Sequence, residues 1–401
     1  MAKLAINGGT ALRTAPYPLW PRYDDAEKKA VLDVLESRQW GTLGPQTQGF
    51  EKDFAEYLGA ARVQTVSSGT VSLEIILRAL GIGPGDEVII PPYTFIATAT
   101  AVLMVGATPV FADIDPLSNN MDSRKAEGVI TSRTRAIIPV HIAGVPADMD
   151  AFTALAEKYK LALIEDAAQA HGSEWKGRKV GSLGTAGSFS FQLSKNMSAG
   201  EGGAIVTNDD ELADKVWSIH HVGRKKDGLW YEHYNLSSNL RMTDWQAAIL
   251  RAQLGRLDSQ INTREKNVSL LNGFLGKIEG IEPFARDPRA TRITHHLYMF
   301  RYNADYFGGV PKNRFVEALT AEGIPAHSGY TPIQQQPVFR SDEVLRITSG
   351  IDYESVDLPA ADKACEQTVW ITQNALLGSE KDMDDIKSSI VKIQENSGEL
   401  A

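Results

Sequence analysis

Short apolar segments alternate with segments of helical period through residues 23–221, and this alternation constrains the fold more than any other feature. The apolar segments have the length of buried strands and lie at 62–66, 86–91, 108–115, 135–141, 161–166, 188–191 and 203–208. Helical periodicity covers 23–40, 48–59, 70–80, 94–106, 149–160 and 209–221. Strands that alternate with helices pair in parallel, because each crossover helix returns the chain to the same end of the sheet. We therefore expect an α/β fold with a mainly parallel sheet flanked by helices.

A long helical stretch follows, from 243 to 278. It exceeds the roughly 8 to 20 residues of a typical globular helix, and helices of this length often bridge two domains. A chain of 401 residues also exceeds what one hydrophobic core usually serves. We expect a large domain at 1–264, a boundary inside the helix near Arg264, and a smaller C-terminal α+β domain at 265–401.

Composition narrows the class of protein. The 43% hydrophobic and 23% charged content is that of a globular protein. A formal net charge of −9 argues against non-specific binding to nucleic acid or to anionic lipid, since both require a basic face. Residues 1–10 lack the apolar core of a secretory signal, and no stretch is long and apolar enough for a membrane helix. We expect a cytoplasmic protein.

The sequence gives no sign of a metal site. Cys365 is the only cysteine, which excludes an intrachain disulfide and a cysteine cluster for zinc. The pairs His220-His221 and His295-His296 are adjacent residues, so neither pair is spaced for one face of a helix, and no carboxylate motif joins them. We expect no bound metal.

A lysine and an acid carry the strongest chemical signal. Lys195 follows the strand at 188–191 in a polar, glycine-rich segment, and Asp166 ends the strand at 161–166. In parallel sheets ligands bind at the carboxyl ends of strands. A lysine that is partly uncharged can hold an aldehyde cofactor as a Schiff base, and a carboxylate can keep a pyridine nitrogen protonated. The pair points to pyridoxal 5′-phosphate (PLP), although each residue alone also fits a surface lysine or a turn-capping aspartate.

Hydroxyl and amide groups nearby suit the rest of such a cofactor. The segment 67–70 follows the first strand and opens a helix, where free backbone N–H groups and the helix dipole attract an anion such as phosphate. An N-cap formed by Ser68 is the alternative. Ser190 is placed to supply a second phosphate donor, and Gln169 to face the phenolic oxygen of the ring.

Six segments in register resemble the signature blocks of one enzyme family, at 67–70, 91–101, 140–150, 164–172, 188–203 and 235–248. The chain resembles the DegT/DnrJ/EryC1/StrS family of PLP-dependent aminotransferases that act on sugars and cyclitols. The resemblance implies a fold-type I aminotransferase architecture and a homodimer.

The resemblance also implies a role for individual residues. Lys195 would carry the Schiff base, and Asp166 would bind the pyridine nitrogen. Asn239 would reach the phosphate bound in the partner subunit, so that the two active sites of the dimer are shared. The remaining cofactor contacts would be Gly69, Thr70 and Ser190 at the phosphate, Phe95 on the ring face and Gln169 at the ring oxygen.

The implied reaction moves an amino group from glutamate or glutamine to a ketone on a sugar or cyclitol, with Lys195 as general acid and base. Segments 4–13, 295–302 and 369–378 resemble the inosose aminotransferase and aminohydroxybenzoate synthase branch. This favours a ketone without a nucleotide, although a nucleotide-linked sugar stays open. His296 is a candidate substrate contact. Where many relatives carry a further histidine, this chain has Gln334 or Gln335.

Two other functions are weighed. A PLP-dependent dehydratase or aromatising enzyme would use the same site, but relatives that dehydrate sugars often replace the lysine by histidine, and Lys195 is retained. A cofactor-binding regulator normally needs an attached DNA-binding domain, and the chain has no spare basic segment outside the enzyme core.

Overall fold

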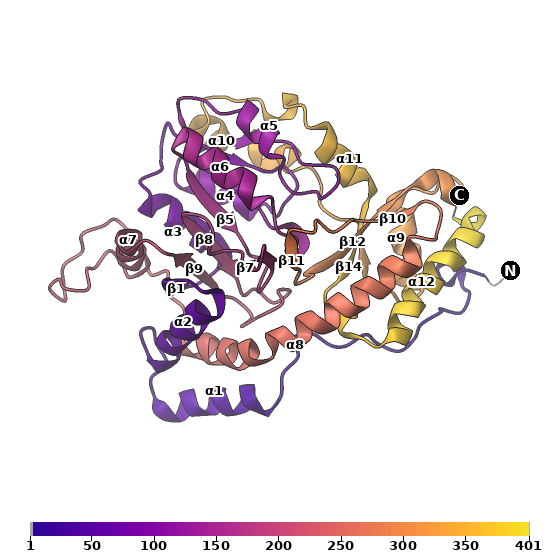
Figure 1. Ribbon diagram of the computed structural model, residues 1–401, viewed down its shortest axis with the longest axis horizontal. Coiled ribbons are helices and arrows are strands. Elements are labelled where there is room, and N and C mark those ends of the chain that lie inside the picture. Colours follow the sequence, from indigo (N-terminus) through magenta and orange to yellow (C-terminus); the bar gives the residue numbers. More distant parts are fainter. Residues whose placement is uncertain (1–2, 401) are drawn as a thin grey trace.

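The computed structural model describes residues 3–400 and is built on a seven-stranded sheet with the strand order β1-β9-β8-β5-β4-β2-β3 (Figure 1). All neighbouring strands are parallel except β9, which is antiparallel to both β1 and β8. The expected mainly parallel sheet is therefore confirmed. The strands are β1 Arg62–Val66, β2 Glu87–Ile90, β3 Thr108–Phe111, β4 Thr134–Ile137, β5 Ala162–Asp166, β8 Ala186–Ser190 and β9 Gly203–Thr207.

Helices cover both faces of this sheet because its strands are apolar on both sides. Side chains alternate between the two faces along a strand. In β2, Val88 and Ile90 join one hydrophobic cluster with α3 and α4, whereas Ile89 joins a second cluster with α2 and α6. The helices of this part are α1 Asp25–Ser37, α2 Pro45–Leu58, α3 Gly69–Ala79, α4 Ala97–Met104, α5 Ser123–Gly128, α6 Met149–Tyr159 and α7 Asp210–His220.

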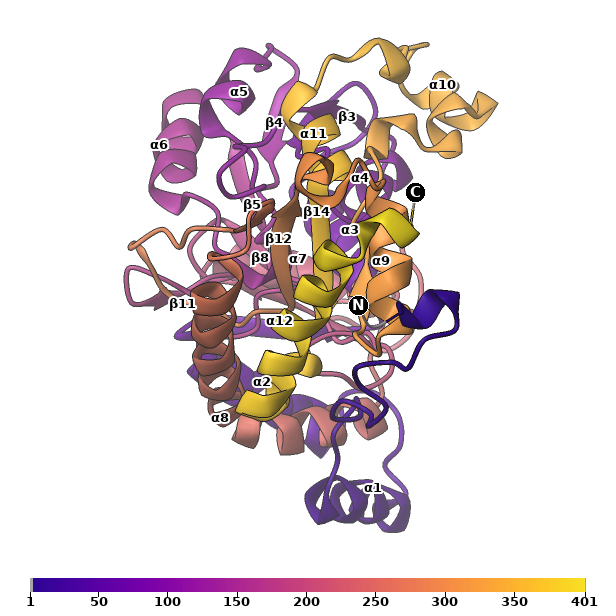
Figure 2. The same ribbon diagram turned by 90° about the vertical axis from the view of Figure 1, so that its right-hand side faces the viewer.

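Helix α8, Asp244–Leu275, is 32 residues long and runs from beneath the sheet to the C-terminal part of the molecule (Figure 1). A four-stranded antiparallel sheet lies there, in the order β10-β12-β14-β13, and α9 and α12 pack beside it (Figure 2). A three-stranded sheet, β11-β6-β7, connects the two parts. The remaining elements are β6 Glu174–Trp175, β7 Arg178–Lys179, β10 Ile281–Pro283, β11 Ala290–Arg292, β12 Leu297–Tyr302, α9 Lys312–Ala321, β13 Ala326–His327, α10 Asp342–Ile347, α11 Pro359–Gln367, β14 Thr368–Thr372 and α12 Glu380–Glu395.

Packing crosses the predicted domain boundary in both directions. Leu4 and Tyr17 belong to the hydrophobic cluster of the C-terminal part. Conversely, Phe339 and Tyr353 contact Phe111 of β3 edge to face and join a cluster of the large sheet. The division at residue 264 stays a prediction. The N-terminal segment packs on the C-terminal part, and a segment from within the C-terminal part packs on the large sheet. None of the helices within residues 3–400 is both long and apolar enough to cross a membrane.

A buried carboxylate fixes the end of β5. Glu165 is fully buried and accepts three backbone N–H bonds of 2.7 to 2.8 Å from the loop 181–184. The Nε2 atom of His141 lies 3.0 Å from the same carboxylate. Buried charges require such partners, and here they lock the strand immediately before Asp166. The strand end is therefore held rigidly at the carboxyl edge of the sheet.

Candidate active site

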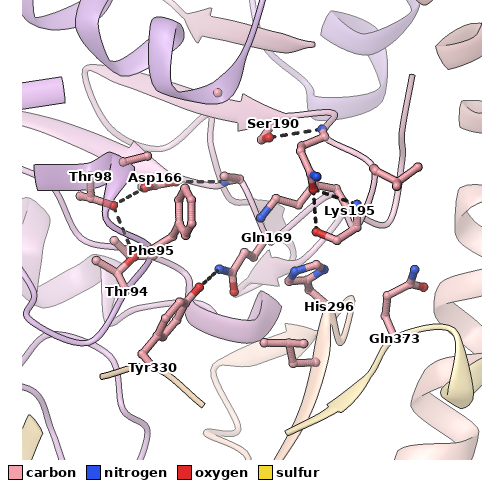
Figure 3. A pocket seen from close by; sticks show the side chains of 18 of the residues that line it. Thr94, Phe95, Thr98, Asp166, Gln169, Ser190, Lys195, His296, Tyr330 and Gln373 are labelled. Carbon is pink, nitrogen blue, oxygen red and sulfur yellow. Dashed lines mark hydrogen bonds between the residues drawn. The ribbon is translucent and has the colours of Figure 1, made fainter. Parts of the chain in front are cut away.

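A cleft of about 960 Å³ opens at the carboxyl ends of β5 and β8 and is closed on the other side by the C-terminal sheet (Figure 3). All predicted cofactor residues except Asn239 line it. Asn239 is exposed and forms an isolated bridge with His221 outside this cleft. The segments that contribute most lining residues are 68–73, 94–98, 166–169, 190–195, 296–297, 327–330 and 370–374, and single residues come from Trp20, Val140 and Glu201.

Lys195 extends from the loop after β8 into the middle of the cleft, between Phe95, Gln169 and His296 (Figure 3). Its backbone N–H donates to the carbonyl of Gln192 at 2.9 Å, which shapes the loop. Burial lowers the pKa of the Lys195 amine to about 8, although the carboxylate of Asp166 opposes this shift. A substantial fraction of the amine is therefore neutral near physiological pH, as a nucleophilic lysine requires.

Asp166 is buried and held by two donors. The hydroxyl of Thr98 donates to Oδ2 at 2.8 Å, and the N–H of Ala168 donates to Oδ1 at 3.2 Å. Burial raises the pKa of Asp166, while these two hydrogen bonds and the Lys195 charge act in the opposite direction. A cationic ring N–H placed against the carboxylate would favour its ionised form further. Thr98 was not predicted, although it lies in the same 91–101 segment as Phe95.

For the start of α3 the sequence left two roles open, a helix cap formed by Ser68 and a binding site for phosphate. Ser68 caps the helix, because its Oγ accepts from the N–H of Val71 at 3.2 Å. The N–H groups of Gly69 and Thr70 lie ahead of that bond at the helix N-terminus, where anions bind. A Cβ on Gly69 would lie 2.6 Å from the Cβ of Ser190, so glycine is needed for α3 to approach β8 this closely. The Ser68 cap therefore leaves these two N–H groups available to an anion.

Gln169 is oriented by two neighbours. Its Oε1 accepts from the N–H of Ala143 at 2.7 Å, and its Nε2 donates to the hydroxyl of Tyr330 at 3.0 Å (Figure 3). Because the oxygen is engaged by a backbone donor, the amide nitrogen faces the cleft with one hydrogen still free. Tyr330, a residue of the C-terminal part, was not predicted. It packs edge to face against Trp370 of the same part and against Tyr93, which follows β2.

His296 lines the cleft on the side away from Ser190 (Figure 3). Burial, followed by the charges of Lys195, His171 and Arg264, lowers its pKa well below the usual value, so the ring is neutral. Nδ1 lies 3.1 Å from Oδ1 of Asn196 and acts as the donor, which leaves Nε2 as an acceptor. Gln334 is buried, and neither it nor Gln335 lines the cleft.

The groups in the cleft fit PLP. An amine of lowered pKa lies between a buried carboxylate and a helix N-terminus that has serine and threonine hydroxyls beside it. Phe95 is 57% exposed although it is a large aromatic residue, and it presents its ring to the cleft (Figure 3). These features match the aldehyde, pyridine nitrogen, phosphate and ring face of the cofactor, and they define a PLP-binding enzyme.

Comparisons with known proteins identify the family. Residues 21–391 match the model of the DegT/DnrJ/EryC1/StrS aminotransferase family. The chain is 38% identical over 423 residues to L-glutamine:2-deoxy-scyllo-inosose aminotransferase of Streptomyces fradiae, covering 100% of both chains. It is 38% identical over 380 residues to 3-amino-5-hydroxybenzoate synthase of Amycolatopsis mediterranei (strain S699), covering 92% of this chain and 96% of the relative. The crystal structure of a 3-amino-5-hydroxybenzoic acid synthase superposes with a TM-score of 0.87 at 36% identity, over 96% of this chain and 99% of that one.

The protein belongs to the DegT/DnrJ/EryC1/StrS aminotransferase family. It is a PLP-dependent aminotransferase with the fold of its solved relatives. The family resemblance, the fold class and the cofactor inferred from the sequence are thereby confirmed. The roles of the individual site residues stay predictions, which the geometry of the cleft supports.

Proposed function

We propose that this protein transfers an amino group from L-glutamine or L-glutamate to the ketone of a cyclitol. The observation that carries the proposal is the position of the Lys195 amine at the centre of a cleft that also holds Asp166, where burial lowers the pKa of the amine. The substrate class rests on several relatives, each 37% to 38% identical over nearly the whole chain, whose names describe glutamine-dependent inosose aminotransferases. Keto-sugars, with or without a nucleotide, are the next candidates.

Each role falls to a residue of the cleft. When bound, PLP supplies an aldehyde that accepts the amino group and a pyridinium ring that draws electrons from the reacting carbon. Lys195 moves the proton between the donor's α-carbon and the cofactor, and Asp166 holds the proton on the ring nitrogen. Phe95 and Gln169 keep the ring in position. His296 offers its Nε2 lone pair to a substrate hydroxyl.

A dehydratase or aromatising activity is the second candidate. It is favoured by the similarity to 3-amino-5-hydroxybenzoate synthase in both sequence and structure. Both reactions would begin in the same cleft, because each needs an amine base beside the cofactor ring. Release of water from a hydroxylated ketone without consumption of an amine would establish this second reaction.

The amino donor and the ketone are tested as separate half-reactions. L-glutamine or L-glutamate, added to the PLP-loaded protein, is expected to bleach the visible cofactor absorption. The aminated protein is then mixed with a panel of keto-cyclitols and keto-sugars, and return of the yellow colour with a new amine in the mass spectrum identifies the acceptor. If neither amino acid changes the spectrum, amino transfer from these two donors is excluded and the proposed reaction fails.

A homodimer with shared sites forms part of the proposal. The segment from 222 to 241 extends beyond α7 (Figure 1) and carries apolar side chains exposed to an extent that is unusual for a monomer. Leu229, Trp230, Tyr231 and Leu236 are each exposed by 71% or more. Asn239 lies in this segment, outside its own cleft, as expected if it serves the partner's phosphate site. The cytoplasmic location stays a prediction.

Mixing two inactive variants tests the shared site. If Asn239 completes the partner's site, co-expressed Lys195→Ala and Asn239→Ala chains form heterodimers with one intact site, made of one chain's lysine and the other chain's asparagine. We expect activity to return in the mixture, measured as glutamine-dependent amination. If Asn239 acts within its own chain, no site is intact and the mixture stays inactive.

A further inference from the structure

A positive charge without a counter-ion lies behind one wall of the cleft. Arg264, in the middle of α8, is fully buried. Its Nη2 donates to Oε1 of Gln373 at 2.5 Å and its Nε to the Gln373 carbonyl at 3.4 Å, while Nη1 is buried without an acceptor among residues 3–400. The nearest aromatic ring over its guanidinium carbon is Trp20, at 5.7 Å. Within residues 3–400, the groups that contact the Arg264 guanidinium are therefore all neutral.

A buried guanidinium of this kind is normally paired with a carboxylate, because an unpaired charge in the interior is unfavourable. Burial lowers the pKa of Arg264 to about 9, and no acidic side chain opposes this shift. Gln373 and Trp20, its two neighbours, both line the cleft. An anion that enters the cleft would therefore lie against the two residues that surround this guanidinium.

The guanidinium also fixes which way the Gln373 amide points. A guanidinium group only donates hydrogen bonds, so Gln373 must turn its oxygen toward Arg264. Its Nε2 is then directed into the cleft as a donor, beside His296 and on the side away from Ser190 (Figure 3). This is the substrate side, because the start of α3 and Ser190 form the phosphate end.

We propose that Arg264 and Gln373 bind the α-carboxylate of the amino donor: Nε2 of Gln373 donates to the carboxylate, and Arg264 orients that amide and supplies the positive charge behind it. The inference rests on the proposed function, since it requires an amino-acid donor. Gln373 is a binding residue in this account, and Arg264 is a positioning residue that acts through it.

The test compares two ligands that differ only in the carboxylate. L-glutamine and 4-aminobutanamide, which is glutamine without its α-carboxylate, are titrated into PLP-loaded protein, and binding is read from the cofactor absorption. Gln373→Leu is expected to weaken binding of L-glutamine by about 10-fold or more, the effect of losing a hydrogen bond to a charged group. Binding of 4-aminobutanamide should stay within about two-fold. The matched control is Gln367→Leu, the same change at the end of α11 outside the cleft, which should alter neither constant.

Two further variants separate charge from shape. Gln373→Glu places a carboxylate against Arg264, so it should weaken glutamine binding more than Gln373→Leu does and leave the melting temperature unchanged or higher. Arg264→Lys keeps the charge but loses the fork of donors, so it should weaken glutamine binding and not that of 4-aminobutanamide. Equal weakening of both ligands, or wild-type glutamine binding in both Gln373 variants, would overturn the inference. If the wild-type protein itself shows no reaction with glutamine or glutamate, it is the proposed function that fails.

Discussion

Lys195→Ala is expected to abolish amino transfer, with a loss of at least about 10⁴-fold, the upper range for removal of a general acid–base group. The variant loses both the covalent attachment point of the cofactor and the base that moves the substrate proton. Single-turnover reaction with L-glutamine, followed by cofactor absorption, measures the effect. Exogenous PLP should still enter the cleft, because the phosphate and ring contacts remain.

The loss must be separated from unfolding. Lys195 lies on a loop after β8, and burial disfavours its charged form, so alanine should not destabilise the fold. The circular dichroism spectrum and melting temperature should match those of the wild type. Lys52→Ala, at an exposed position in α2, is the control and should keep full activity. Turnover by Lys195→Ala within about 100-fold of wild type, smaller than the general acid–base range, would remove Lys195 from its role.

Asp166→Asn is expected to lower kcat/KM for glutamine by about 10² to 10³-fold, the cost of removing one electrostatic contact at the reacting group. Asparagine has nearly the same shape but carries no charge, so it does not hold a proton on the ring nitrogen. The cofactor should therefore still bind while its ring draws electrons less strongly. Steady-state kinetics together with the cofactor spectrum separate these two effects.

The same substitution should leave the apo-protein as stable as before, or more stable. Burial raises the pKa of Asp166, which means that the ionised carboxylate is unfavourable in the folded protein without a cationic partner. Thr98→Val provides a graded comparison: it removes one donor to the carboxylate but leaves the Ala168 N–H, so its effect should be smaller. Unchanged turnover in Asp166→Asn would show that another group controls the ring nitrogen.

Strands and helices whose apolar residues recur with a clear period were predictable from the sequence, and elements without such a period were not. Each predicted strand from 62 to 208 overlaps one of the seven strands of the large sheet, because short segments rich in apolar residues, such as EVII in β2, mark strands that are buried on both faces. Helix α8 was expected at 243–278 and spans Asp244–Leu275. Helix α5 was not predicted, since its six residues SRKAEG carry no apolar period. The C-terminal part was expected only as α+β, because strands as short as β10 and β13 give little signal.

The residues of the candidate site also fall into a predictable and an unpredictable group. Asp166 ends β5, and the segment 67–70 and Lys195 lie in the loops after β1 and β8, so the topology alone brings them to one edge of the sheet. Tyr330 and Gln373 reach the cleft from the C-terminal part, where no local pattern indicates which strand faces the site. Arg264 marked only a domain boundary in the sequence. Its importance arises from burial and from a missing partner, which only the three-dimensional arrangement shows.

Borohydride reduction of the PLP-loaded protein, followed by peptide mass spectrometry, tests the central claim most directly. Reduction makes the lysine–cofactor link permanent, so the modified residue can be read from the fragment spectrum. The account predicts a phosphopyridoxyl group on the peptide that contains Lys195, and its absence from every other lysine. A protein that binds PLP and yields no adduct at Lys195, or yields the adduct on a different lysine, would contradict it.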